Sequence, residues 1–260
     1  KIGLKNYKEG KKNMEKKDIN VLEQMQNMTV DLNSKALIEK AEKDGVETMY
    51  KRKLGYKVQC GFGLQGVCCR NCGMGPCRIS AKTPRGLCGA DEHTIVGRNF
   101  ARMCAAGTAA HSDHARDITH TLALTCPGGD YQVKEPQKLV EFAKFMDVDP
   151  EGKDIYELAH EVAEVCLMEF GKPFGVSKLL KRAPKVRQEL WHKLGIEPRA
   201  IDREIATVMH STHIGCTADL DSLIHMSMRC SMADGWAGSM IGTMISDILF
   251  GTPKRSEEHT

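Results

Sequence analysis

Aromatic side chains and long hydrophobic runs are both scarce in this sequence. Phe, Trp and Tyr make up 5% of the 260 residues, and no stretch of eighteen apolar residues occurs. The most hydrophobic run, from Trp236 to Phe250, is interrupted by Asp247. A transmembrane helix needs about 20 mainly apolar residues, so the sequence predicts no membrane span. It also shows no signal-peptide pattern, and the cytoplasm is therefore the expected location.

An excess of charge of one sign is also absent from the body of the chain. The formal net charge is +3, but residues 1–13 carry +4 and residues 255–260 carry −1, which leaves the chain between them neutral. Nucleic-acid-binding domains usually present a strongly basic patch. The composition therefore predicts no nucleic-acid partner.

Both ends of the sequence look foreign to the protein. The chain begins with Lys1, and KEGKKN before Met14 is what a purine-rich ribosome-binding leader would encode if it were translated. The last six residues, RSEEHT, match the translation of a common sequencing-adapter oligonucleotide. We therefore predict a non-native leader at 1–13, a native domain at 14–253 and a non-native tail at 254–260.

The period of the hydrophobic residues is helical almost throughout, and no alternating strand pattern of useful length occurs. The sequence predicts a mostly α, multi-helical domain, interrupted by a cysteine-rich loop at 55–90. Asn33 or Ser34 is the expected N-cap of the first helix, and Asp91 is the expected N-cap of the long helix after the loop. The expected helices span 35–52, 91–124, 136–146, 154–170, 177–194, 198–210 and 219–249.

Cysteine is abundant, and its spacing is the most informative feature of the chain. Six of the 11 cysteines lie within 29 residues, at positions 60, 68, 69, 72, 77 and 88. Such density in a chain without a secretion signal favours metal binding over disulfides. A zinc site normally uses two separated pairs of Cys or His ligands, whereas this loop has a single Cys-x-x-Cys. An iron-sulfur cluster is the better interpretation.

The six cysteines divide into a set of four and a pair. Cys69, Cys72 and Cys77 lie on a short loop, and Cys88 returns as a fourth ligand, which suits one [4Fe-4S] cubane. Cys68 is adjacent to Cys69, and neighbouring side chains diverge, so it belongs to another centre together with Cys60. Two cysteines need a second identical pair to hold a cluster, and a two-fold axis would supply it. We therefore expect a homodimer with a shared cluster.

These residues carry a specific resemblance to a known family. The pattern Cys60-x7-Cys68-Cys69-x2-Cys72-x4-Cys77, with GLCGA around Cys88, resembles the N-terminal region of the nickel-iron anaerobic carbon monoxide dehydrogenases. The likeness covers roughly residues 35–253 and includes HIG at 213–215 and ADGWAGSMIGTMISDILFGTP at 233–253.

The resemblance implies both cofactors and an activity. It assigns the four-cysteine set to a [4Fe-4S] cluster within each subunit and the pair to a [4Fe-4S] cluster shared across the dimer. It implies oxidation of CO with water to CO2, two protons and two electrons, with a ferredoxin-type acceptor and, in some members, an acetyl-CoA synthase subunit. The nickel-iron-sulfur ligands lie on later α/β, Rossmann-like domains that are missing here, so the segment by itself is not expected to oxidise CO.

A row of histidines follows the cysteine loop. His111, His114 and His120 stand at i, i+3 and i+9 on the long expected helix. By themselves they fit a polar helix face whose histidines happen to be frequent, although imidazoles at such spacing are able to pass protons. The resemblance implies a proton relay of four histidines, of which the third is replaced here by Asp117.

Two other interpretations stay open on the sequence alone. One is a hybrid-cluster protein or hydroxylamine reductase, a related helical iron-sulfur architecture whose N-terminal cysteine spacing differs. The other is a helical interaction module that is stabilised by zinc and has no enzymatic activity. Iron, sulfide and zinc analysis after anaerobic purification distinguishes these alternatives.

Overall fold

The computed structural model describes residues 21–56 and 58–253, and the fold is mostly helical, as predicted. The predicted leader at 1–13 and tail at 254–260 lie outside the described residues. The chain divides into two compact units, Lys1–Leu64 and Gln65–Thr260. The domain predicted at 14–253 and the loop predicted at 55–90 each include residues of both units. No helix in the described parts is long and apolar enough to cross a membrane.

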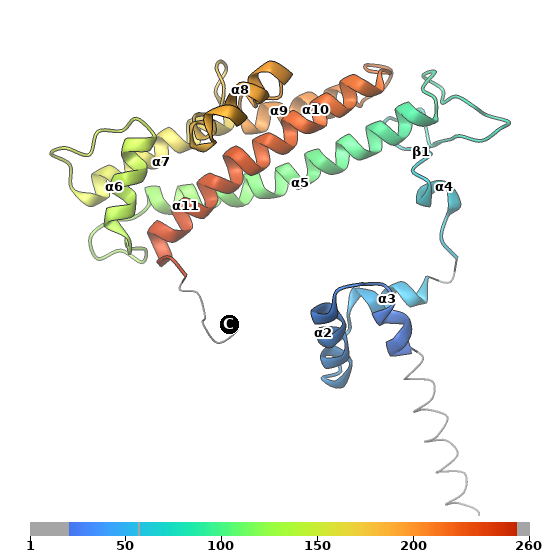
Figure 1. Cartoon of the computed structure of the whole chain (residues 1–260), viewed down its shortest axis with the longest axis horizontal. Helices are drawn as coiled ribbons and strands as arrows, with labels where there is room; N and C mark the ends of the chain where they lie inside the picture. Colours follow the sequence, from blue (N-terminus) through green and yellow to red (C-terminus); the bar gives the residue numbers. More distant parts are fainter. Residues whose placement is uncertain (1–20, 57, 254–260) are drawn as a thin grey trace, which may run out of the picture. The chain divides into compact units, whose positions relative to one another are not determined.

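The first unit is built from short helices, labelled in Figure 1. They are α2 (Leu32–Lys43), α3 (Met49–Gly55) and α4 (Gly61–Leu64). The single helix predicted at 35–52 is wrong, because Gly45 has a φ of +71° and Thr48 caps a new helix with its side chain. The N-cap of α2 is Asp31, which accepts a hydrogen bond from Ser34 N, rather than Asn33 or Ser34. Ile38 and Met25 are buried in this unit.

The second unit is organised around α5 (Glu92–Ala123), a helix of 32 residues. Asp91 caps it as predicted, accepting from Thr94 N at 2.9 Å. Small residues on its buried side, including Ala101 and Ala105, let other helices approach closely. Its neighbours are α7 (Ile155–Gly171), α9 (Ile201–Ser211), α10 (Leu220–Ala233) and α11 (Ser239–Phe250).

The last helical segment runs parallel to α5 along its length (Figure 1). Gly97 lies beside Leu220 near the start of both helices, and Thr108 Oγ1 donates to Cys230 O at 3.2 Å further along. Between α10 and α11 the chain forms a five-residue π-helical turn, η2 (Asp234–Gly238). Beyond this turn, a Cβ on Gly242 would lie 3.3 Å from Ala115 Cβ, so the glycine permits close contact between α11 and α5.

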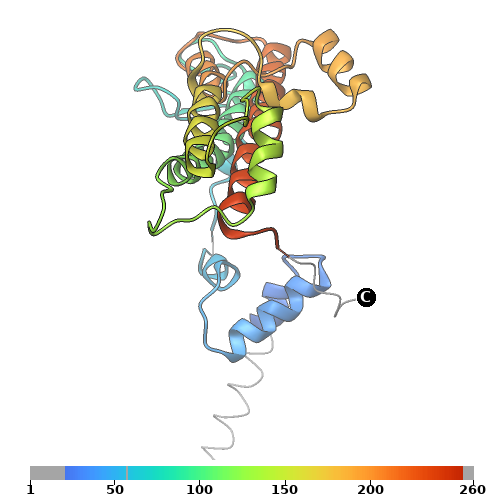
Figure 2. The same cartoon turned by 90° about the vertical axis from the view of Figure 1, so that its left-hand side faces the viewer.

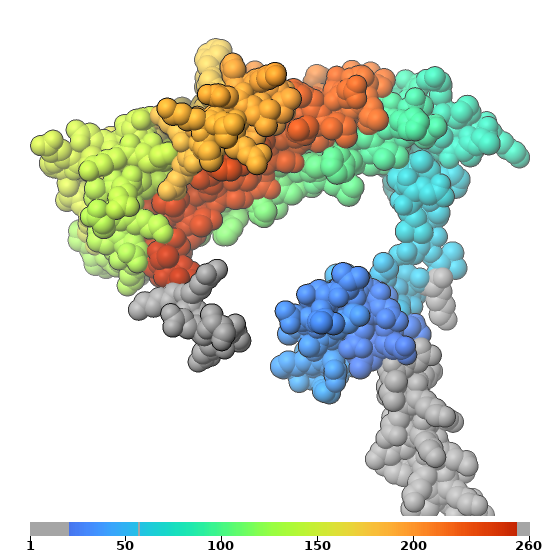
Figure 3. Space-filling view, in the orientation of Figure 1, coloured from blue at the N-terminus to red at the C-terminus, as the bar shows by residue number. Residues whose placement is uncertain are grey.

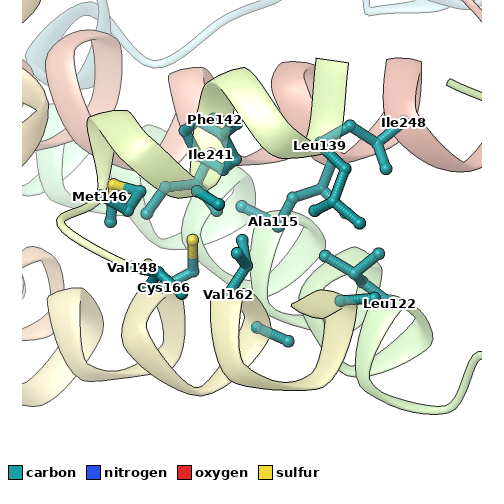
Figure 4. Close-up of a cluster of buried hydrophobic side chains, with 14 of the residues drawn as sticks. Ala115, Leu122, Leu139, Phe142, Met146, Val148, Val162, Cys166, Ile241 and Ile248 are labelled. Carbon is teal, nitrogen blue, oxygen red and sulfur yellow. The ribbon is translucent and has the colours of Figure 1, made fainter. Parts of the chain in front are cut away.

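The largest core of the second unit lies at the C-terminal end of α5. Figure 4 shows side chains of α5, α7, α11 and α6 (Pro136–Phe145) meeting there, with Phe142, Val162 and Ile241 among them. In the space-filling view of Figure 3, α6 and the cysteine loop occupy opposite ends of this unit. The large core therefore lies far from the four cysteines of the loop that belong to this unit and line the pocket.

A small additional layer covers one side of the bundle. It consists of η1 (Lys178–Arg182) and α8 (Lys185–Leu194), which replace the single helix predicted at 177–194 because Pro184 interrupts it. In Figure 2 this layer stands beside the other helices. Trp191 packs against Trp236, with ring centroids 5.0 Å apart, and this contact ties the layer to η2.

Candidate metal centre

Four of the six clustered cysteines surround one pocket near the start of α5. Strand β1 (Cys68–Cys69) pairs antiparallel with β2 (Cys77–Arg78), and Cys69 stands directly opposite Cys77. Directly opposed residues of such a pair share one face, and Cys72 lies in the connection between the strands. Cys88 precedes α5 and completes the set, so that Cys69, Cys72, Cys77 and Cys88 all line one pocket.

The four cysteines line this pocket without forming a site for a single metal ion. Among the residues that the structure describes, no three His, Cys, Asp or Glu side chains are placed to hold a single metal ion. The backbone fits tightly around the pocket: a Cβ on Gly75 would lie 3.1 Å from both Cys69 O and Cys77 N. Leu87 N donates to Cys77 Sγ at 3.5 Å. A glycine at position 75 lets the loop close around the cysteines.

The electrostatic environment favours a thiolate at Cys88. Arg98 Nη1 donates to Cys88 Sγ at 3.4 Å. This hydrogen bond is the main cause that lowers the pKa of Cys88 below its ordinary value of 9.0. The thiolate is the form that binds metals. The site is therefore prepared for a cationic group.

One polar atom in the pocket has no partner. Asn71 Nδ2 is buried without a hydrogen-bond acceptor, and Asn71 lines the same pocket as the four cysteines. A buried donor left without a partner costs about 1–3 kcal/mol. Thiolate or sulfide sulfur inside the pocket would accept its hydrogen bond. The pocket residues thus fit a sulfur-rich group, both in their ligands and in this free donor.

Cys60 and Cys68 stand apart from the four-cysteine pocket. Cys68 is adjacent to Cys69 on β1, and successive side chains of a strand point to opposite faces. Cys68 belongs to the second unit, whereas Cys60 lies exposed in the first unit, just before α4. Neither of them lines the pocket.

The histidines lie on the exposed side of α5. His111 and His114 line a second pocket together with Ser239 and Gly242. His111 Nδ1 lies 2.8 Å from Asp234 Oδ1, and Ser239 Oγ donates to the same oxygen at 2.7 Å. His120 is exposed and does not line this pocket. The structure therefore brings two of the three predicted histidines to one pocket.

Three residues of these sites were not predicted from the sequence: Arg98, Asn71 and Asp234. Asp234 opens the π-helical turn, and such turns often occur at functional sites. The sequence signal that could have identified Asp234 was its place in the segment at 233–253, which resembles the family and contains several glycines. Nothing in the sequence around Arg98 or Asn71 distinguishes them from surface residues.

An isolated cysteine is most simply expected to be a small buried hydrophobe, and this is correct for only some of the five cysteines outside the loop. Cys166 and Cys230 are buried, and burial raises the pKa of each thiol. Cys104 is half-buried. Cys126 and Cys216 are exposed, which corrects the expectation for these two.

A mostly helical unit that closes four cysteines around one pocket belongs to the class of helical iron-sulfur proteins. Within that class, the chain is a member of the Prismane/CO dehydrogenase family, whose model matches residues 67–260.

Three relatives illustrate the extent of the match. Carbon monoxide dehydrogenase 1 of Methanosarcina mazei is 47% identical over 231 residues, which are 87% of this chain and 37% of that protein. The carbon monoxide dehydrogenase/acetyl-CoA synthase subunit beta of Moorella thermoacetica is 36% identical over 87% of this chain and 35% of that protein. The nickel-free carbon monoxide dehydrogenase structure from Thermococcus sp. AM4 has a TM-score of 0.77 at 50% identity, covering 85% of this chain and 36% of that one. The chain therefore spans a little over a third of the relatives it matches.

Proposed function

We propose that this chain is the electron-relay part of an anaerobic carbon monoxide dehydrogenase, with a [4Fe-4S] cluster held by Cys69, Cys72, Cys77 and Cys88. The observation that carries the proposal is the common pocket of these four thiols. A zinc ion would need its thiolates about 2.3 Å from one point, whereas no three His, Cys, Asp or Glu side chains of the described residues are placed to hold one ion. When bound, such a cluster supplies one-electron transfer.

The protein's own residues hold and tune this site. The Arg98 side chain favours the Cys88 thiolate, and Leu87 N donates to Cys77 Sγ. The unpartnered Asn71 Nδ2 offers a further donor. Hydrogen bonds to cluster sulfur affect the reduction potential, so these donors serve electron transfer as well as binding.

Cys60 and Cys68 are proposed to hold half of a second [4Fe-4S] cluster, shared with another copy of the chain. The alternation along β1 supports this assignment, because Cys68 points away from the face that carries Cys69. A homodimer follows from the proposal, since one chain supplies only two of the four ligands.

His111 and His114 are proposed to carry protons along α5, with His120 as a further member. The support is the pocket that the first two share and the hydrogen bond from His111 to Asp234, which orients the imidazole. Asp117, also exposed on α5, stands where the family has its third histidine, and it would relay through water or orient a neighbouring ring.

In the complete enzyme we propose oxidation of CO with water to CO2, with electrons passed to a ferredoxin-type acceptor. The nickel-iron-sulfur cluster would be bound by residues outside this chain, and the segment alone is not expected to turn over CO. The name of the Moorella relative supports an acetyl-CoA synthase subunit as a further partner. The relatives described above are named carbon monoxide dehydrogenases, so a hydroxylamine reductase and a zinc module have no comparable support.

Anaerobic reconstitution of the 260-residue chain tests the cluster assignment. One cubane and half of a shared cubane predict about six irons per chain, with equal sulfide. Cys72→Ser is expected to remove about four irons per chain. Cys60→Ser is expected to remove about two irons per chain and to prevent formation of the dimer. Cys126→Ser changes an exposed cysteine outside the pocket and is the matched control. Zinc without sulfide in the wild-type chain would refute the assignment.

A further inference from the structure

Arg98 is the largest fully buried side chain in the described part of the protein. It lies on the second turn of α5, is 1% exposed and lines the pocket of the four cysteines. A guanidinium stays charged at any physiological pH. Burial of a charge is costly unless an opposite charge or a full set of hydrogen bonds compensates it.

The partners of Arg98 do not include a carboxylate. Its Nε and Nη2 donate to Thr217 O at 3.0 and 2.5 Å, and its Nη1 donates to Cys88 Sγ at 3.4 Å. No Asp or Glu in residues 21–56 or 58–253 forms an ion pair with it. The compensating negative charge is therefore expected from the thiolates that line the pocket, of which Cys88 is in direct contact with the guanidinium.

The same side chain fastens the connection between α9 and α10 over the pocket. Thr212 and Ile214 of this connection line the pocket. Thr217 O receives both hydrogen bonds from Arg98, and the next carbonyl, Ala218 O, accepts from Thr94 Oγ1 at 3.0 Å. One guanidinium thus joins a ligand thiol to the segment that covers it.

We propose that Arg98 is a positioning residue that raises the reduction potential of the four-cysteine cluster while holding the 212–218 connection against Cys88. This inference rests on the proposed [4Fe-4S] site. Reduction adds negative charge to the pocket, and a buried cation in contact with a ligand sulfur stabilises the reduced state more than the oxidised state. The low dielectric of a buried site strengthens this effect. Loss of the cation therefore makes reduction harder.

The test is a redox titration of the anaerobically reconstituted chain, followed by electron paramagnetic resonance. A Cys60→Ser background leaves the four-cysteine cluster as the source of the signal. Arg98→Met is expected to lower the reduction equilibrium constant about tenfold or more, which is about 59 mV towards negative values for one electron. Arg98→Lys keeps a positive charge without the fork of donors and is expected to give a smaller shift in the same direction.

Arg102→Met is the matched control. Arg102 lies one turn further along α5, and its Nε donates to Thr212 Oγ1 at 3.0 Å, so it also joins α5 to the covering connection. It donates to no cysteine sulfur, and its replacement is expected to shift the potential by less than half as much as Arg98→Met.

The outcomes separate this inference from the proposed function. A wild-type chain that forms no cubane would defeat the proposed function. A cubane whose potential is the same in Arg98→Met and in the wild type would overturn the role of Arg98 alone. Loss of the cluster from both Arg98 variants, with retention in Arg102→Met, would assign Arg98 a purely structural role and would also overturn the inference.

Discussion

The two ends of α5 are stabilised in different ways. At the C-terminal end, side chains from α5, α6, α7 and α11 form a large apolar core (Figure 4). At the N-terminal end, the apolar cluster is small and its buried members are Cys69, Ile79, Ala90 and Ile95. Around this cluster lie turns, two-residue strands, hydrogen bonds donated by Arg98 and the start of α10, which packs against α5.

This difference indicates that the two ends depend on different sources of free energy. Buried apolar area stabilises the C-terminal end at about 25 cal/mol per Å². The cysteine loop has little such area, so we expect bonds to metal to supply most of its order. A long helix joins the two, which lets a loop that needs a cofactor be attached to a core that does not.

Removal of iron should have the largest effect, and it should affect the two ends of α5 unequally. We expect a chelator under anaerobic conditions to abolish hydrogen-exchange protection in residues 66–90, with an opening free energy near zero. Protection in α7 and α11 should remain, because their packing contains no cluster ligand. Exchange measured by mass spectrometry on the loaded and stripped chain tests this. A loop that stays protected without iron would show that the cysteine end is stable by itself.

Phe142→Ala should have the opposite result, because it should destabilise the large core and leave iron binding unchanged. Phe142 is fully buried in the large core, and its truncation is expected to cost about 3–5 kcal/mol of unfolding free energy. Iron bound per folded chain should not change, since the pocket lies at the other end of α5. Urea unfolding and iron analysis measure the two quantities.

Phe174→Ala provides the control for that substitution. Phe174 is 85% exposed, so the same change should cost less than about 0.5 kcal/mol. Equal destabilisation by the two variants would contradict the assignment of the core.

His111→Ala asks whether the exposed face of α5 between the two ends has a role of its own. In a complete enzyme that carries these residues, turnover should fall about 100-fold, or about 2.7 kcal/mol in the barrier, because a proton-transfer group is lost. The control is His192→Ala. His192 Nδ1 lies 2.8 Å from Glu197 Oε2, a pair with the same geometry on another helix. Unchanged turnover from about pH 6 to 9 would remove His111 from the proton path.

The sequence predicted the elements whose signals are local. The capped helix at 91–124 is observed as α5, because Asp91 and the alanine-rich turns that follow act within a few residues. The helix predicted at 35–52 failed where a local signal was overlooked, since Gly45 and Thr48 together end one helix and begin another.

The sequence predicted which four cysteines come together at one pocket, but it did not predict the residues around them. Cysteine spacing alone proposed the set of four, and pairing of Cys69 with Cys77 on a small ribbon places those two on one face. Arg98 and Thr217 are 119 residues apart in sequence, and their contact exists only because α5 and α10 pack in parallel. His111 and Asp234 meet for the same reason. A single sequence contains no local sign of such contacts.

The smallest predicted effect concerns the junction where the cysteine end passes into α5. Thr94 N donates to the Asp91 carboxylate, and this hydrogen bond is the main cause that lowers the pKa of Asp91 from its ordinary value of 3.8. A lowered pKa means that the contribution to stability is present above pH 3.8 and is lost as the pH falls through the lower, folded value. Asn caps a helix about as well as Asp but carries no charge.

Asp91→Asn should therefore leave stability near neutral pH almost unchanged and remove one component of the acid destabilisation. Urea midpoints of the iron-free chain between about pH 6 and 3 measure it. Asp219, the N-cap of α10, also has a lowered pKa through its hydrogen bond with Ser222, and Asp219→Asn should remove a similar, independent component. If Asp91→Asn has the same urea midpoint as the wild type at every pH while Asp219→Asn does not, the start of α5 does not unfold together with the core. The segment that unfolds separately from the core would then include the first turns of α5 as well as the cysteine loop.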